Sequence, residues 1–234
     1  MNLVIQRAGR DLAMARTRQR ICLIALFILV GAFAVNAEVL SEAELRNLLA
    51  RIRENRITQA DFQEQRIIHL MQKPIVNSGK VWFRPPNKFR REVKGNSPSL
   101  TVSDGQQLWI YYPNFKSAER YSLGKRSPLD SIIASINAAL NLENIENTFH
   151  ITATQAGHGH ELELTPRTAS MKRSFQKLNL RINDNLQAER TDMLQPNGDR
   201  IVTIYSNQTR APVPPSTFEF TPPPGTDIAT PLGQ

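Results

Sequence analysis

The sequence predicts an α+β fold, in which a curved antiparallel sheet forms an incomplete β-barrel and helices cover its concave face. Three observations predict this class. About ten short segments alternate apolar and polar residues, with the period of two that is typical of half-buried strands. Turn signals such as Asp-Gly at 104–105 and Asn-Gly at 197–198 separate several of them. Two further segments carry apolar stripes at helical spacing, and a sheet with one apolar face needs such covers.

The N-terminal segment, residues 1–37, predicts a cleavable export signal. Arginines precede an uninterrupted apolar run at residues 21–35, which is shorter than the roughly 18 residues of a membrane-spanning helix. The small residues Val35 and Ala37 predict cleavage after Ala37. Met14 is a second candidate start, and a permanent membrane anchor is the alternative to cleavage.

The net charge and the cysteine count of the chain both fall when this segment is removed. The 234 residues contain 29 Lys+Arg and 21 Asp+Glu, a net charge of +8, and one cysteine. Removal of residues 1–37 takes away five arginines and one aspartate, which halves the net charge, and it also removes Cys22. A cysteine-free exported chain excludes a disulfide scaffold and a Cys-rich zinc site. Export also argues against a nucleic-acid partner. Residues 38–234 contain no evident linker or repeat, so we expect a single domain.

The first helix is predicted to begin after Ser41. Ser41 can cap it, Glu44 completes a capping box, and Leu40 and Leu45 are spaced as a hydrophobic staple. One face of this helix is apolar at helical spacing and comprises Leu45, Leu48, Leu49 and Ile52.

Strands follow on both sides of a second helix. The predicted strands before it are 57–71, 80–84, 88–94, 100–103, 107–112 and 119–123, with a turn at Ser78-Gly79. The second helix begins at Ser127-Pro128, and its apolar stripe comprises Leu129, Ile132, Ile133, Ile136 and Leu140. The predicted strands after it are 148–154, 160–165, 175–183, 186–193, 200–206 and 218–220.

No catalytic constellation, metal site or cofactor motif is predicted, so we expect a protein that is not an enzyme. His158 and His160 with Glu161 could suggest a metal site, but the flanking glycines and the alternation that follows favour an exposed hairpin turn. Asp61 and Glu64 would face opposite sides of a strand, which disfavours an acid–base pair.

The basic stretch at residues 84–94 has two interpretations. It combines five cationic residues with Phe89. A solvated strand face is the simpler interpretation, and contact with an anionic membrane or an acidic partner is the functional one.

Four motifs, in this order, resemble those of the periplasmic outer-membrane lipoprotein carrier family (LolA-like). They are DFQEQ at 61–65, GKVWFRPPNKFR at 79–90, VSDGQQLWIYYP at 102–113, and FEF at 218–220 followed by PPGTD at 223–227. The resemblance extends over nearly the whole of residues 38–234. It implies the same incomplete barrel that the strand and helix pattern predicts.

The resemblance also implies a function. Such carriers hold the acyl chains of a lipoprotein in an apolar cavity and shuttle them from an inner-membrane transporter to an outer-membrane receptor. Each methylene removed from water contributes about 0.8 kcal/mol, so acylated cargo needs a carrier to cross an aqueous compartment. We therefore expect a periplasmic monomer with transient partners and a lipoprotein or other acylated lipid as cargo. The alternative is a lipid- or glycolipid-binding accessory or sensor protein of an envelope exporter.

The family pattern can be carried over to a set of cavity residues. Two departures bear on it: Pro85 stands before Pro86-Asn87, where some members have an arginine, and Arg91 stands where such members carry tryptophan. An arginine that points into the cavity would favour an anionic head group. For each aliphatic residue, plain core packing is the alternative to lining a cavity. The predicted lining residues are Leu45, Leu49, Ile52, Phe62, Phe89, Arg91, Ile132, Ile133 and Ile136.

Overall fold

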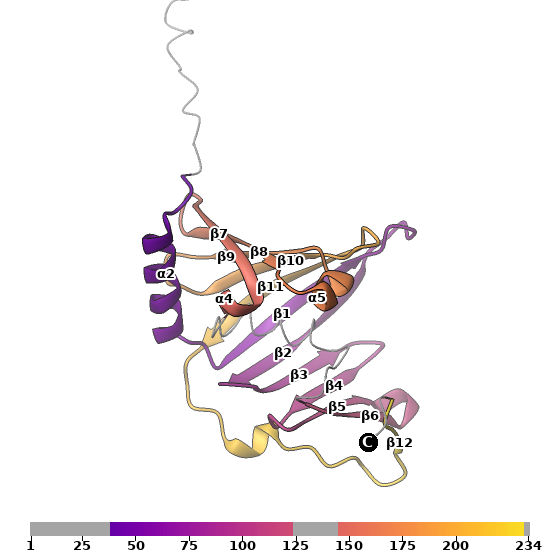
Figure 1. Cartoon of the computed structure of the whole chain (residues 1–234). Coiled ribbons are helices and arrows are strands. Elements are labelled where there is room, and N and C mark those ends of the chain that lie inside the picture. Colours follow the sequence, from indigo (N-terminus) through magenta and orange to yellow (C-terminus); the bar gives the residue numbers. More distant parts are fainter. Residues whose placement is uncertain (1–37, 124–144, 232–234) are drawn as a thin grey trace, which may run out of the picture. The chain divides into compact units, whose positions relative to one another are not determined.

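A computed structural model describes residues 38–123 and 145–231 (Figure 1). All of them belong to a compact unit that extends from Ala37 to Gln234. The predicted export signal and the predicted second helix lie outside the described residues, as do Ile132, Ile133 and Ile136.

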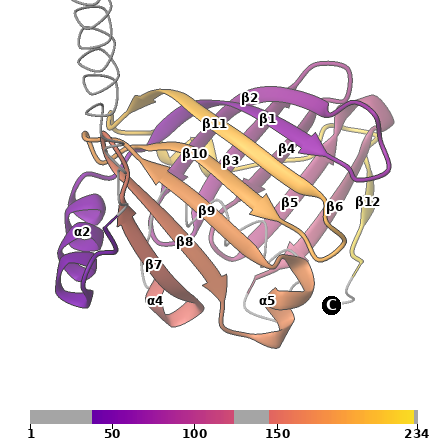
Figure 2. The ribbon, with the colours of Figure 1, turned by 90° about the horizontal axis from the view of Figure 1, so that it is seen from above.

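The described strands form one sheet of twelve, in the order β12-β6-β5-β4-β3-β2-β1-β11-β10-β9-β8-β7. The chain makes two antiparallel meanders, β1 to β6 and β7 to β11, which the pairing of β1 with β11 joins into one sheet (Figure 2). β12 pairs with β6 in parallel. The strand bounds are β1 Gln59–Ile67, β2 Ile75–Arg84, β3 Lys88–Lys94, β4 Ser99–Ser103, β5 Gln107–Tyr112, β6 Ser117–Ser122, β7 Phe149–Gln155, β8 His160–Pro166, β9 Lys177–Ile182, β10 Ala188–Leu194, β11 Arg200–Thr209 and β12 Asp227–Ala229.

The expected fold class is confirmed in part: the strands form a single large, mostly antiparallel sheet that stays open, accompanied by a few short helices, whereas helices covering its concave face remain a prediction. The described helices are α2 (Glu42–Glu54), α4 (Ile145–Thr148) and α5 (Ala169–Ser174), with 3-10 turns η1 (Pro113–Phe115) and η2 (Pro215–Phe218).

Helix α2 begins where the sequence predicts. The Ser41 hydroxyl accepts a hydrogen bond from the Glu44 N–H at 3.4 Å, and the Glu44 carboxylate accepts one from the Ser41 N–H at 2.8 Å. This reciprocal pair is the predicted capping box. Just before it, the chain pairs with the edge strand β7: the Leu40 N–H donates to the Ala153 carbonyl at 2.8 Å. The segment thereby covers hydrogen-bonding groups of that edge.

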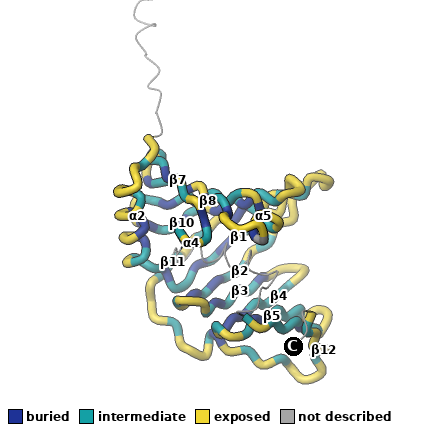
Figure 3. Tube along the Cα trace, in the orientation of Figure 1, coloured by how far each residue is buried: buried dark blue, intermediate teal, exposed yellow. Residues whose placement is uncertain are grey.

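The core has two parts, visible as the dark stretches of the tube in Figure 3. In one, α2 packs through Leu48, Leu49 and Ile52 into a cluster that includes Leu162, Leu164, Leu178, Leu180 and Ile182 from β8 and β9. In the other, β1, β2, β3 and β5 contribute Ala60, Phe62, Val81, Phe83, Phe89, Val93 and Leu108. Tyr205 packs against both clusters, so they lie on one face of the sheet, which we call the inner face.

The predicted turn at Ser78-Gly79 is wrong, because both residues lie within β2. A β-carbon on Gly79 would lie 1.8 Å from the Glu92 carbonyl oxygen and 2.8 Å from Phe62 Cζ. The glycine therefore permits a close approach to β3 and makes room for the Phe62 ring, which is a common reason for glycine within a strand.

The C-terminal segment also differs from the prediction. Residues 218–220 do not form a strand; Phe218 ends the 3-10 turn η2 and is buried. The Phe220 ring lies 5.9 Å from that of Trp109 and 5.5 Å from that of Tyr111, centroid to centroid. Aromatic packing against β5 thus takes the place of a ladder of hydrogen bonds. Helix α5 and strand β12 were not predicted.

Candidate functional site

A pocket of about 1090 Å³ lies over the inner face. Both meanders contribute to it, so the sheet curves around it. The apolar side chains that line it from the strands include Phe62, Val81, Val93, Ile110, Tyr112, Leu178, Met193, Ile201 and Tyr205.

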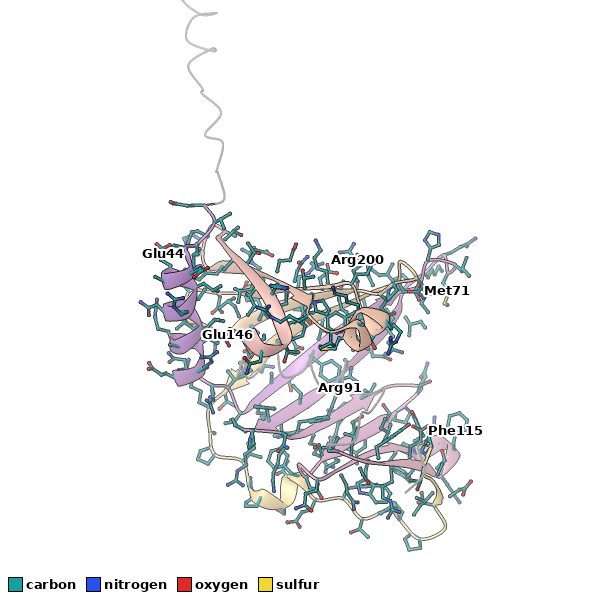
Figure 4. All side chains as sticks on the ribbon, viewed as in Figure 1. Glu44, Met71, Arg91, Phe115, Glu146 and Arg200 are labelled. Carbon is teal, nitrogen blue, oxygen red and sulfur yellow. The ribbon has the colours of Figure 1, made fainter. Side chains whose placement is uncertain are left out.

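An ion pair lies in this pocket. Nη2 of Arg91 on β3 donates to Oε2 of Glu64 on β1 at 2.6 Å, and the two side chains are only 20% and 12% exposed. The guanidinium carbon of Arg91 also lies 4.3 Å from the centroid of the Phe62 ring. Figure 4 shows Arg91 over the central strands. The guanidinium is therefore held by a carboxylate and an aromatic face together.

Polar side chains continue from this pair across the inner face. Glu64 stands opposite Thr203 in the β1–β11 pairing, and Thr203 stands opposite Thr191 in the β10–β11 pairing. Both threonines are buried and line the pocket. Burial raises the pKa of the Tyr205 phenol, while the neighbouring Thr191 hydroxyl and the charge of Arg91 lower it and Glu64 raises it. The pocket thus has apolar walls and a polar row on its floor.

The curvature of the sheet is also apparent from Arg66 and Tyr112. Three strands separate β1 from β5 in the sheet, which is about 19 Å at the usual strand spacing. Both residues nevertheless line the pocket. Burial raises the pKa of Tyr112, the charge of Glu119 raises it further, and the charge of Arg66 lowers it. Arg66 and Tyr112 therefore interact across the pocket.

A second buried hydroxyl lies on the same sheet half. The Tyr121 hydroxyl donates to Glu119 Oε2 at 2.6 Å, and burial together with this bond raises the pKa of Tyr121 to about 12. Tyr121 packs against the cluster that contains Phe62. The bond satisfies the hydroxyl there, as buried polar groups require.

The structure brings two of the predicted lining residues into this pocket, Phe62 and Arg91. Phe89 is fully buried in the cluster beneath, among Phe83 and Leu108, and is not part of the lining. Leu45, Leu49 and Ile52 of α2 belong to or pack against the other cluster and are also absent from the lining.

The expected effect of Arg91 changes once its partner is known. The sequence predicts a cationic pocket that favours an anionic head group, but Glu64 pairs with this guanidinium and also lies 3.5 Å from Nε of Arg66, so it offsets part of the positive charge. The sequence does allow one part of this to be predicted: Glu64 lies on the same face of its strand as Phe62, because residues two apart in a strand share a face. The contributions of Tyr205, Thr191 and Thr203 depend on pairings between distant segments, for which the sequence holds no local signal.

The basic stretch at residues 84–94 does not form one surface. Arg91 points into the pocket, whereas Arg90 pairs with Glu92 at 2.7 Å and donates to the Thr217 carbonyl at 3.3 Å. Arg84 lies on β2 and is exposed. The charges are thus divided between two strands and both faces of the sheet.

The metal site that His158, His160 and Glu161 could suggest is not formed in the described residues. His158 is 97% exposed in the β7–β8 turn, and its Nδ1 lies 3.4 Å from Asp184. Among residues 38–123 and 145–231, no group of three or more histidine, cysteine or acidic side chains is arranged to hold a metal ion.

No helix in the part of the chain that the structure describes is long and apolar enough to cross a membrane.

Known proteins resemble this chain in both sequence and fold. An outer-membrane lipoprotein carrier protein of Dechloromonas aromatica (strain RCB) is 28% identical over 182 residues, which cover 76% of this chain and 83% of the relative. Another, of Chromobacterium violaceum, is 28% identical over 211 residues, which cover 88% and 98%. A crystal structure of an uncharacterized conserved protein from Thermus thermophilus matches with a TM-score of 0.50 at 14% identity, covering 80% of this chain and 99% of that one.

The sequence model of one family matches residues 55–221, and its description is outer membrane lipoprotein carrier protein LolA. That range includes strands β1 to β11 and every side chain described above as lining the pocket. Since the match extends over well over half of its length, the chain belongs to the LolA family of outer membrane lipoprotein carrier proteins.

Proposed function

We propose that the protein is a periplasmic carrier, which binds acyl chains of lipoproteins in the inner-face pocket and moves them from the inner membrane towards the outer membrane. The observation that carries this proposal is the pocket itself. Its volume of about 1090 Å³ lies slightly above the roughly 300–1,000 Å³ that is typical of ligand pockets. Its lining combines aliphatic and aromatic side chains with polar ones, and the apolar part suits hydrocarbon chains.

The compartment follows from the N-terminal segment. We propose that residues 1–37 direct export and are removed after Ala37. The Gln155 N–H donates to the carbonyl of Glu38, the residue that follows this position, at 3.0 Å. Cleavage at Ala37 would therefore leave the described sheet pairing intact.

The proposed partners are transient. A carrier of this kind receives its cargo from an inner-membrane transporter and delivers it to an outer-membrane receptor, and we propose that it does so as a monomer. Binding and release of cargo in the pocket need no covalent chemistry, so the proposal assigns no enzymatic step and no cofactor.

A second candidate function is favoured by the polar floor of the pocket. A lipid whose polar group enters the pocket could exchange hydrogen bonds with Arg91, Glu64 and Tyr205, whereas an acyl chain alone would leave these groups to each other. A lipid- or glycolipid-binding accessory protein of an envelope exporter would have such a cargo.

One experiment separates these functions. The protein is purified from the periplasm of its own host, and the lipids that copurify are extracted and identified by mass spectrometry. We expect acylated lipoprotein, and we expect the purified protein to release lipoprotein from spheroplasts. Extraction of a glycolipid with no lipoprotein release would favour the second function, and a lipid-free protein that releases nothing would contradict both.

A further inference from the structure

The turn between β1 and β2 exposes a group of large apolar side chains. Leu70 is 92% exposed, Met71 is 50% exposed and Val76 is 61% exposed, and Ile67 and Ile75 are exposed as well. We call residues 66–76 the β1–β2 tip. Single exposed apolar residues are common on protein surfaces, but a concentration in one short segment indicates a contact surface.

The β1–β2 tip is a defined turn. The Met71 N–H donates to the Ile68 carbonyl at 2.9 Å, and the His69 N–H donates to Asp199 Oδ1 in the β10–β11 turn at 2.8 Å. Leu70 and Met71 therefore point outward from a turn whose adjacent residues are held by hydrogen bonds. Figure 4 shows Met71 at the end of this hairpin.

The tip adjoins the pocket. Arg66, Ile75 and Val76 belong to the pocket lining. The lining also includes Phe115 of η1, which is 79% exposed and follows β5 at the same end of the sheet (Figure 4). The apolar residues exposed at this end thus continue from the pocket lining, so a hydrocarbon chain could pass between them and the pocket with little exposure to water.

Cationic side chains lie next to both groups of exposed apolar residues, the β1–β2 tip and Phe115. The β1–β2 tip contains Arg66, His69 and Lys73 and no carboxylate, and exposed Lys116 directly follows Phe115. Two acidic residues outside the tip contact it: Asp199 accepts a hydrogen bond from the His69 N–H, and Glu64 lies 3.5 Å from Nε of Arg66. Apolar side chains flanked by cations are the combination that binds the interface of an anionic bilayer.

We propose that the β1–β2 tip and Phe115 dock on the surface of an anionic phospholipid bilayer, with Leu70 and Met71 entering the interface. This contact would bring the pocket to the membrane that supplies or receives the cargo. It goes beyond the carrier function, because it assigns a direct contact with lipid in addition to any contact with a protein.

The experiment uses residues 38–234, the compact unit that the proposed cleavage after Ala37 leaves, with one new cysteine that carries an environment-sensitive fluorophore. Leu70→Cys places the dye on the tip, and the matched control Ile204→Cys places it on an exposed aliphatic position of β11. The probe is vesicles of phosphatidylglycerol and phosphatidylethanolamine, compared with phosphatidylcholine alone.

We expect a blue shift at position 70 with the anionic vesicles, a weaker one with phosphatidylcholine, and none at position 204. Lys73→Glu should weaken the apparent vesicle affinity roughly fivefold or more, since each cation near an anionic surface contributes about that factor. Absence of a shift at position 70, an equal shift at both positions, or no preference for anionic vesicles would overturn the proposal.

Uptake of a fluorescent long-chain fatty acid in the absence of vesicles tests the carrier function separately. Leu70→Ser with Met71→Ser should leave this uptake unchanged, because neither residue lines the pocket. Docking without uptake would contradict the carrier function alone, and uptake without docking would contradict the bilayer contact alone.

Discussion

Arg91 and Glu64 meet across an intervening strand: Nη2 of Arg91 on β3 lies 2.6 Å from Oε2 of Glu64 on β1, and β2 runs between the two strands. Gly79 on β2 has no side chain to separate them, and Phe62 fills that space beneath the guanidinium. Glu64 also lies 3.5 Å from Nε of Arg66, so one carboxylate serves two arginines in the pocket, and an anionic group that enters must compete with Glu64 for Arg91.

Loss of one partner should destabilise the fold. Glu64→Gln leaves the Arg91 guanidinium without its carboxylate in a mostly buried setting, and we expect a loss of about 1–3 kcal/mol in the free energy of unfolding. Urea denaturation measures it. The matched control is the exposed pair of Arg181 and Glu161, where Glu161→Gln should cost no more than about 1 kcal/mol, since Arg181 keeps its second partner Glu189. Equal losses for both variants would contradict a special role for the pocket pair.

Gly79 should not tolerate a side chain. Gly79→Ala would place Cβ 1.8 Å from a backbone oxygen of β3, so β2 and β3 must move apart, and we expect a loss of about 3 kcal/mol or more. The neighbouring Ser78→Ala is the control, because Ser78 is exposed on the same strand. Thermal unfolding compares the two variants; a Gly79→Ala protein as stable as the control would show that the close approach is not required.

His160 should make stability depend on pH. Burial lowers its pKa, the charge of Arg51 lowers it further, and Asp184 raises it. The unfolded chain then binds a proton more readily than the folded one, so this contribution to stability is complete above the ordinary histidine pKa of about 6.5 and is lost as the pH falls towards the lowered value.

Urea unfolding at pH 5.5 and 7.5 tests the histidine. His160→Phe should reduce the difference in stability between the two pH values, whereas the control His158→Gln, at a 97% exposed position, should leave it unchanged. A difference that persists in full in the His160→Phe protein would assign the pH dependence to other groups.

Local patterns in the sequence predict much of this fold. The capping box at Ser41 and Glu44, the alternation of residues 88–94 and the turn at Asp104-Gly105 depend on neighbouring residues only, and all three are confirmed. The turn predicted at Ser78-Gly79 is wrong because a glycine that allows the close approach of a neighbouring strand cannot be distinguished in sequence from a glycine that makes a turn.

The candidate site is less predictable from the sequence, because it depends on pairings between strands that are distant in the chain. The lining by Phe62 and Arg91 was expected from resemblance, but the partner of Arg91 depends on the register of three strands. Phe89 and Leu49 were expected in the lining but are buried in the core. An apolar pattern predicts burial, but it does not indicate whether the side chain faces a pocket or other side chains.

The most direct test of the central claim, that acyl chains occupy the inner-face pocket, uses two isoleucines of β11. Ile201 lines the pocket, and Ile204, an odd number of residues away on the same strand, is exposed on the other face. Binding of a fluorescent long-chain fatty acid is measured for Ile201→Glu and Ile204→Glu, with circular dichroism to verify folding. A carboxylate in an apolar wall should weaken binding about tenfold or more for Ile201→Glu. The Ile204→Glu protein should bind like the unmodified one. Equal affinities of the two folded variants would contradict the assignment of acyl chains to this pocket.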